Sequence, residues 1–265
     1  MTNNAHIIDT LNTSAASHER DQTAASAPRR QNRYRVVAIT FLCLGVVGYA
    51  AVTYFGFDPS SSNVGLRPNI PWQYPLLMTH ILTASVALTL GPLQFVRRIR
   101  RHQRLHRYIG RAYLFAGVFP ASIAGFGVAL LATGGPIAAA GLAVGDILWM
   151  VTAIAGYRAA RAKRYREHAD WMIRNFALTF SAVSFRIWLP LLILVQVPLL
   201  DSFYNSNFRV LFNHAYSATA WLAFIPNLLF INSYLKRRQH RSVPNDPAGL
   251  AAGGQIGRSQ EISTS

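Results

Sequence analysis

Six long apolar runs dominate the pattern of hydrophobic and polar positions along this chain. At a rise of about 1.5 Å per residue, each run is long enough to cross about 30 Å of hydrocarbon. Backbone polar groups in lipid must be satisfied within their own segment, so the runs predict helices. We therefore expect an all-α, polytopic membrane helix bundle with six transmembrane helices. The runs are Val36 to Phe55, Tyr74 to Val96, Ala112 to Thr133, Ile137 to Tyr157, Trp171 to Val195, and Val210 to Leu235.

The basic residues between these runs predict how the helices are oriented. RRIRRHQRLHRYIGR follows the second run, RAARAKRYREHAD follows the fourth, and KRRQHR follows the sixth. The opposite connections hold only Arg67 and Arg209 as basic residues. Because short basic loops stay on the cytoplasmic side, we expect both termini to be cytoplasmic. The expected location is the cytoplasmic (inner) membrane of a bacterium, as a multi-pass protein.

Both ends of the chain have a composition that is typical of disorder. Residues 1–34 are rich in Ala, Ser, Thr and Asn, and residues 237–265 are polar and then rich in Gly, Ala and Ser. Such segments bury too little apolar surface to offset the entropy that is lost on ordering. We expect two disordered cytoplasmic tails that flank a transmembrane domain of residues 35–236.

The charge of the chain supports this organisation and excludes one class of partner. Lysine and arginine number 26 against 10 acidic residues, and the net charge is +16. In a soluble domain this balance would suit nucleic acid. Here the basic residues border the apolar runs and no aromatic and basic recognition module accompanies them. The expected partners are the lipid bilayer and anionic lipid at the cytoplasmic basic loops, and no nucleic acid.

Ionisable residues inside the runs are candidate site residues, because a charge in hydrocarbon is costly. His80 lies about 9 Å and His214 about 8 Å inside their helices, and Arg186 lies about 13 Å before the outer end of its own. We expect these three to line a cavity in the outer leaflet that binds a cofactor or an anionic small molecule. Two alternatives remain open: the histidines form interhelical hydrogen bonds, or Arg186 pairs with Asp146, the acidic residue within the runs.

A second pair of histidines lies near the cytoplasmic side. His106 and His168 occur at similar depth, with Arg111 and Arg174 one or two turns further inward. Two facing imidazoles at each surface predict bis-ligated haem, with nearby arginines neutralising the propionates. The alternative is that histidines in basic loops meet only water and phosphate.

Several short motifs resemble those of a known membrane-protein family. His80 is followed by HRYIGR at 106–111, by HADWMIR at 168–174, and by the Arg-Ile-Trp sequence at 186–188. This combination resembles a bacterial family called domain of unknown function 2306, whose name implies no activity. A looser similarity is to six-helix cytochrome b type electron carriers, which implies paired helix histidines that hold two haems. The fourth helix has no histidine, which departs from that pattern.

These observations lead to three hypotheses of function. The first is a b-type haem electron-transfer protein with His80 and His214 as iron ligands, which would be a membrane-bound oxidoreductase or electron carrier. The second is a proton-linked small-molecule transporter or a membrane sensor, with Asp146, Arg186 and the histidines as its polar pathway. The third is a structural membrane partner. Haem b is the cofactor of the first hypothesis, and the sequence identifies no catalytic residue for any of them.

Overall fold

The computed structural model describes residues 34–62 and 65–241, and every regular element in those ranges is a helix. Six helical segments are long and apolar enough to cross a membrane, which confirms the predicted all-α bundle with six spans. The side on which the termini lie stays a prediction. Residues 1–33 and 242–265, most of the two predicted tails, lie outside the described residues. The spans are Tyr34–Tyr54, Gln73–Leu93, Gln103–Leu130, Pro136–Arg161, Tyr165–Leu199 and Phe208–Gln239.

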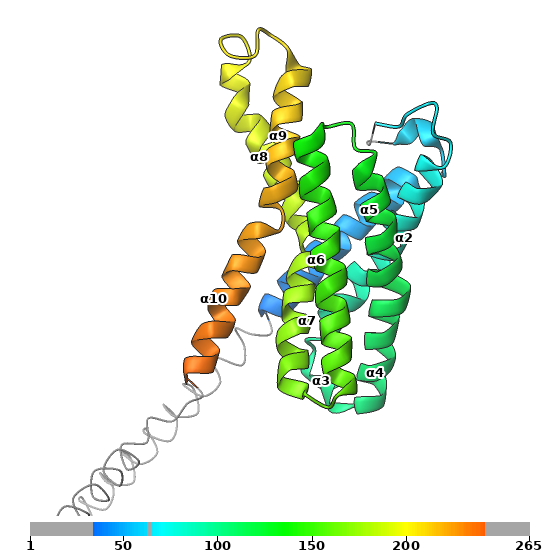
Figure 1. Cartoon of the computed structure of the whole chain (residues 1–265), viewed down its shortest axis with the longest axis vertical. Helices are drawn as coiled ribbons and strands as arrows, with labels where there is room; N and C mark the ends of the chain where they lie inside the picture. Colours follow the sequence, from blue (N-terminus) through cyan, green and yellow to red (C-terminus); the bar gives the residue numbers. More distant parts are fainter. Residues whose placement is uncertain (1–33, 63–64, 242–265) are drawn as a thin grey trace, which may run out of the picture.

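The spans are built from helices that pack side by side in a bundle (Figure 1). Helices α2, α4, α5, α6 and α7 form its main body, whereas α8 and α9 rise above it and α10 leans away (Figure 1). The arginine-rich segments 97–111 and 158–166 lie together at one end, which we call the basic end. The elements after the N-terminal helix are η1 (Pro59–Ser61), α2 (Gln73–Leu93), α3 (Arg97–Arg101), α4 (Gln103–Ala112), the π-helix η2 (Tyr113–Val118), α5 (Phe119–Leu130), α6 (Pro136–Arg161), α7 (Tyr165–Thr179), α8 (Ser181–Gln196), η3 (Val197–Leu199), α9 (Phe208–Leu222) and α10 (Ile225–Arg241).

Proline explains two of the interruptions within the spans. Pro120 cannot donate a backbone hydrogen bond, and the π-helical segment η2 ends two residues before it. Pro226 likewise has no N–H, and the sixth span is broken between α9 and α10, which restarts at Ile225. Both breaks fall inside the apolar spans, where neighbouring helices and adjusted backbone bonds satisfy the freed groups. The interruptions therefore bend the spans without ending them.

The tight connection between α5 and α6 depends on one glycine. Gly135 has a φ of 90°, a conformation that residues with a Cβ atom rarely adopt, and it immediately precedes α6. Pro136 then occupies the first position of the helix, where its missing N–H costs nothing. This glycine and proline pair allows α5 and α6 to run antiparallel and in contact.

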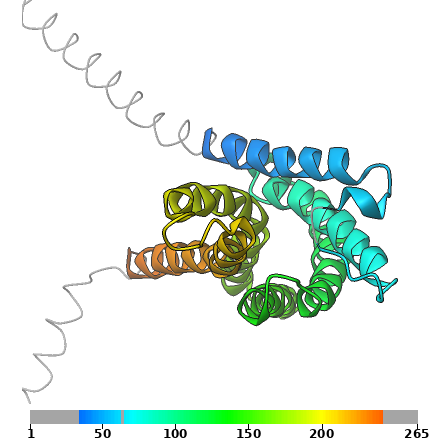
Figure 2. The same cartoon turned by 90° about the horizontal axis from the view of Figure 1, so that it is seen from above.

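The core of the bundle lies where η2, α6 and α7 meet. Tyr113, Trp149 and Leu178 belong to its buried cluster, and small residues let the helices approach closely. The N-terminal helix lies along one side of the bundle, beside α2 and α8 (Figure 2). There Cys43 packs in a second buried cluster with Leu88 and other residues of these two helices. The N-terminal helix therefore covers the outside of the bundle near the site described next.

Candidate functional site

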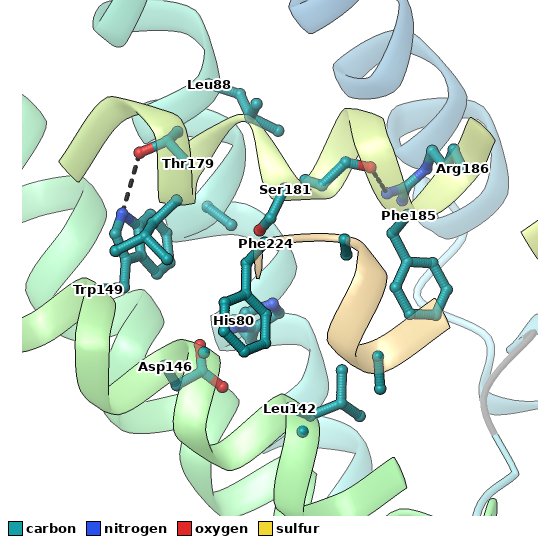
Figure 3. A pocket seen from close by; sticks show the side chains of 17 residues that line it. His80, Leu88, Leu142, Asp146, Trp149, Thr179, Ser181, Phe185, Arg186 and Phe224 are labelled. Atoms are coloured by element: carbon teal, nitrogen blue, oxygen red, sulfur yellow. Dashed lines mark hydrogen bonds between the residues drawn. The ribbon is translucent and has the colours of Figure 1, made fainter. Parts of the chain in front are cut away.

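A cavity of about 210 Å³, partly open to the surroundings, lies where α2, α6, α8 and α9 meet, and Arg186 at its edge is exposed. Three ionisable side chains line it, each from a different span: His80, Asp146 and Arg186. Asp146 and Arg186 lie on opposite sides in this view, with His80 between them (Figure 3). The volume is below the 300–1,000 Å³ that is typical of pockets for drug-sized ligands. The cavity therefore suits a small solute or a group of water molecules.

His80 is held in a defined orientation by the backbone of α5. Its Nδ1 atom lies 2.9 Å from the carbonyl oxygen of Ala121. Because a carbonyl can only accept, Nδ1 carries the proton of this bond. In the neutral imidazole, Nε2 is then the basic nitrogen. His80 can therefore take up a second proton without breaking the bond that positions it.

Gly125 of α5 allows the side chains of His80 and Asp146 to lie close together. A Cβ atom at Gly125 would lie 2.6 Å from Nδ1 of His80 and 2.7 Å from Oδ2 of Asp146. Real Cβ atoms essentially never approach other atoms so closely. The imidazole and the carboxyl group therefore occupy the space that any larger residue would need. Only a glycine at this position is compatible with the observed arrangement.

Most of the hydrogen-bond donors of Arg186 remain available to a ligand in the cavity. Its Nη1 atom donates to the carbonyl oxygen of Ala182, 2.9 Å away on the same helix, and its guanidinium lies over the ring of Tyr49 at 5.5 Å. A guanidinium has five N–H donors, so this bond uses a minority of them. Within residues 34–62 and 65–241 no ion pair joins Arg186 to Asp146. The Arg186–Asp146 pair that the sequence left open is absent from these residues.

A buried hydrogen-bond network adjoins the cavity on the side of the basic end. Trp149 and Thr179 line the cavity, and the indole Nε1 donates to the hydroxyl of Thr179 at 2.9 Å. Behind them, the Tyr113 hydroxyl lies 2.7 Å from that of Thr179 and donates to Oδ1 of Asn175 at 2.6 Å. Asn175 in turn donates to the carbonyl of Trp149 and to the hydroxyl of Thr152. This satisfied network makes a rigid wall for the cavity.

His214 lies elsewhere. It is on α9 with an exposed side chain, its ring packs edge-on against Tyr204 at 5.6 Å, and it is not one of the residues that line the cavity. The structure therefore brings together His80 and Arg186 of the predicted outer site, and adds Asp146 in place of His214. The expected depth of these residues in the bilayer stays a prediction, and depth leaves the rotation of the helix open.

The predicted cytoplasmic histidines lie near one another at the basic end. His106 on α4 is close enough to His168 on α7 for an electrostatic interaction, and Arg100 is a further neighbour. Nδ1 of His168 lies 2.9 Å from the carbonyl oxygen of Gly156. The buried Nδ1 atom of His106 has no hydrogen-bond partner in the described part of the chain. Of the two imidazoles, that of His168 is oriented by a backbone carbonyl and that of His106 is not.

The two predicted arginines of the basic end differ in their surroundings. Arg174 is half-buried: its Nε donates to Oδ1 of Asn232 at 2.8 Å, and its guanidinium lies over the ring of Trp171 at 5.0 Å. Arg111 is exposed, as are all other arginines of segment 97–111. Arg174 therefore has a structural role in joining α7 to α10. The exposed arginines keep anionic lipid as a predicted partner of the basic end.

Several functional features escaped the sequence analysis. Gly125 carried no signal, because glycine is frequent in transmembrane helices. The Ala121 carbonyl is a backbone group and has no sequence signature. Asp146 did have a signal, since it is the acidic residue within the apolar runs; the sequence left it either as a partner of Arg186 or as part of a proton-linked polar pathway, and did not place it beside His80.

The fold and the cavity together define a class: an integral membrane protein with six spans and a cavity lined by ionisable residues. The chain belongs to the predicted membrane protein family DUF2306, whose sequence model matches residues 77–235. The match covers more than half of the chain and includes the cavity residues and the histidine pair of the basic end. No curated protein and no solved structure matches the chain. As a membrane protein, it contacts the lipid bilayer.

Proposed function

We propose that this protein is a proton-linked transporter of a small solute that carries an anionic group. The observation that carries the proposal is the convergence of His80, Asp146 and Arg186 in one cavity within apolar spans. Ionisable groups are expensive at this depth and mark ion and substrate pathways in other membrane proteins. Three of them from three helices, without direct ion pairs within the described ranges, are poorly explained by stability alone.

Each residue has a role that follows from its chemistry. The guanidinium of Arg186 binds the anionic group, because its planar fork of donors fits oxyanions. His80 accepts a proton on Nε2 while its Nδ1 stays bonded to Ala121. The neighbouring carboxyl group of Asp146 stabilises the resulting imidazolium or carries the proton itself. An anion and a proton that move together are neutral overall, which lowers the cost of crossing hydrocarbon.

The proposal is tested by binding and by flux with a defined panel of solutes: acetate, lactate, benzoate, phosphate and methanesulfonate. A solute at about 100 times its Kd stabilises a protein by about 2.7 kcal/mol, a shift of several degrees in the unfolding temperature. We expect at least one panel member to produce this shift in the wild type and in Arg209→Gln, an exposed control. Arg186→Gln should lose it.

Flux is measured in liposomes that contain a pH-sensitive dye. A gradient of the stabilising solute should drive protons in the same direction as the solute in wild-type vesicles and in Asp201→Asn, a loop control. Asp146→Asn should abolish the proton movement. The proposal is wrong if no solute binds in an Arg186-dependent way, or if Asp146→Asn vesicles acidify like the wild type.

Electron transfer by a b-type haem is a second candidate, and one observation favours it. His106 on α4 and His168 on α7 interact electrostatically, and the hydrogen bond between Nδ1 of His168 and the carbonyl of Gly156 leaves Nε2 of that ring as the potential ligand. Metal-binding histidines in proteins are commonly oriented in this way. The candidate haem ligands are therefore His106 and His168 at the basic end, in place of His80 and His214.

The haem candidate is tested by absorption spectra of the purified protein, oxidised and reduced with dithionite, and by a pyridine haemochrome assay. Haem binding predicts a reduced α band that is lost in His106→Ala and His168→Ala and is retained in His102→Ala, an exposed neighbour. A colourless, folded protein from haem-replete cells would reject this candidate and leave the transport proposal untouched.

A further inference from the structure

A second hollow, of about 270 Å³, opens on the outside of the bundle between α5 and α6. Its apolar lining includes Ile123, Phe126, Ile147 and Val151, and the first of these is 66% exposed. Because the residues belong to transmembrane spans, this hollow faces the hydrocarbon of the bilayer. We call it the α5–α6 groove.

Asp146 lines both the α5–α6 groove and the interior cavity. Ser122, the other polar residue of the groove, donates its hydroxyl to the carbonyl of Val118 at 2.7 Å. Asp146 is therefore the ionisable group that the groove offers to a ligand. Gly125 adds no side chain beside it, and the carboxyl group of Asp146 and the imidazole of His80 fill the space next to this glycine.

We propose that the α5–α6 groove is a lateral entrance from the bilayer and that the transported solute is a lipid-soluble carboxylic acid. Its hydrocarbon chain lies in the groove, and its acid group reaches past Asp146 into the cavity. This inference rests on the proposed transport function and specifies the substrate class of the same site.

Charge complementarity selects this occupant over others. A lipophilic cation would be attracted by Asp146 but repelled by Arg186 on the far side of the cavity. A neutral lipid would leave the guanidinium without a counter-charge. A carboxylic acid is neutral while it lies in hydrocarbon, where a free charge is costly. It becomes an anion only where Arg186 can bind it.

The proton transfer balances within the cavity. The O–H bond of the acid breaks, and its proton forms an N–H bond at Nε2 of His80. The imidazolium that results lies beside the carboxyl group of Asp146, and the carboxylate of the solute is bound by Arg186. The net charge is unchanged, because the neutral acid and the neutral imidazole become a carboxylate and an imidazolium of opposite charge.

The experiment measures protection of a thiol in the groove. Cys43 is the only cysteine of the chain, so a Cys43→Ala background allows a single thiol to be introduced. Ile147→Cys places it in the groove, and Leu229→Cys places it on α10, where the side chain is 63% exposed and is not part of the groove lining. The full-length protein is reconstituted in liposomes, and labelling by a lipid-soluble maleimide is followed over time.

Decanoic acid is the probe, with decanol as the matched ligand that lacks the acid group. At saturation we expect decanoic acid to slow labelling of Ile147→Cys about tenfold, with no effect on Leu229→Cys. Decanol should protect much less, and Arg186→Gln should remove the protection by decanoic acid. Equal protection at both thiols, equal protection by decanol, or no protection at all would each overturn the proposal.

The lateral entrance and the transport function can fail separately. If acetate or another small anion stabilises the protein through Arg186 while decanoic acid leaves the groove thiol unprotected, only the lateral entrance is rejected. If neither small anions nor decanoic acid give an Arg186-dependent response, the cavity is not a solute site and both proposals fall.

Discussion

Gly125→Ala provides the sharpest test of the site geometry. The new methyl group would lie 2.6–2.8 Å from Nδ1 of His80 and both carboxylate oxygens of Asp146, whereas ordinary Cβ contacts begin at 3.4 Å. The two side chains must therefore move apart by about half an ångström or more. Overpacking of this kind costs about 1–3 kcal/mol. The strained His80–Ala121 bond adds about 0.5–1.5 kcal/mol, and helix propensity offsets about 1 kcal/mol.

Together these contributions predict that Gly125→Ala lowers the free energy of unfolding by about 0.5–3.5 kcal/mol. Gly48→Ala is the matched control, because no atom lies within 4 Å of its new methyl group. Unfolding is followed by tryptophan fluorescence during titration of mixed micelles with dodecyl sulfate. Adding His80→Ala to Gly125→Ala should recover part of the loss through a favourable coupling energy. If Gly125→Ala is as stable as Gly48→Ala, the close approach of His80 and Asp146 to Gly125 is refuted.

Two further predictions concern the wall of the cavity and the topology. Tyr113→Phe removes a hydroxyl that donates to Asn175, and the amide oxygen left without a partner should lower the free energy of unfolding by about 1–3 kcal/mol. Tyr108→Phe, which changes an exposed ring of α4, should leave it unchanged. Equal stability of the two variants would contradict the network. The predicted orientation requires that, in the Cys43→Ala background, Ala162→Cys be labelled by a membrane-impermeant maleimide only after cells are opened, and Ser202→Cys in intact cells. The reverse pattern would invert the topology.

The number of spans was predictable from sequence because it depends on local quantities. Run length, the absence of charge and the need to satisfy backbone groups all act within one segment. Helix ends were less predictable: the third span begins at Gln103 instead of Ala112, because helix α4 continues beyond the apolar residues into the basic segment. Basic side chains at a membrane surface do not stop a helix.

The site was only partly predictable because it depends on how the helices are rotated. The predicted residues His80 and Arg186 both line the cavity, but His214, expected at matching depth, is not in its lining and packs on Tyr204. The positions of His80 and Asp146 both depend on Gly125, which comes from a third helix. Rotation and close approach are properties of the packed bundle, and a single sequence does not contain their signal.

The energetics of Asp146 separate a structural role from a functional one. An aspartate at the centre of a transmembrane helix costs about 2.5–3.5 kcal/mol, and no ion pair within the described ranges offsets this cost. Leucine has a similar branched shape without the charge. Asp146→Leu should therefore raise the free energy of unfolding by about 1–3 kcal/mol while abolishing proton movement in liposomes.

A structural ion pair gives the opposite result, because removing one partner of a buried pair lowers stability by about 3–5 kcal/mol. Asp146→Asn, which keeps the shape and removes the charge, should shift stability in the same direction as Asp146→Leu but by less. Both variants are measured by the same titration with dodecyl sulfate. A loss of stability in both would mean that Asp146 holds the bundle together, and the cavity would no longer need a transport function to explain its acid. A gain would mean that the chain retains a destabilising group at this depth, which only a role in handling protons or solutes explains.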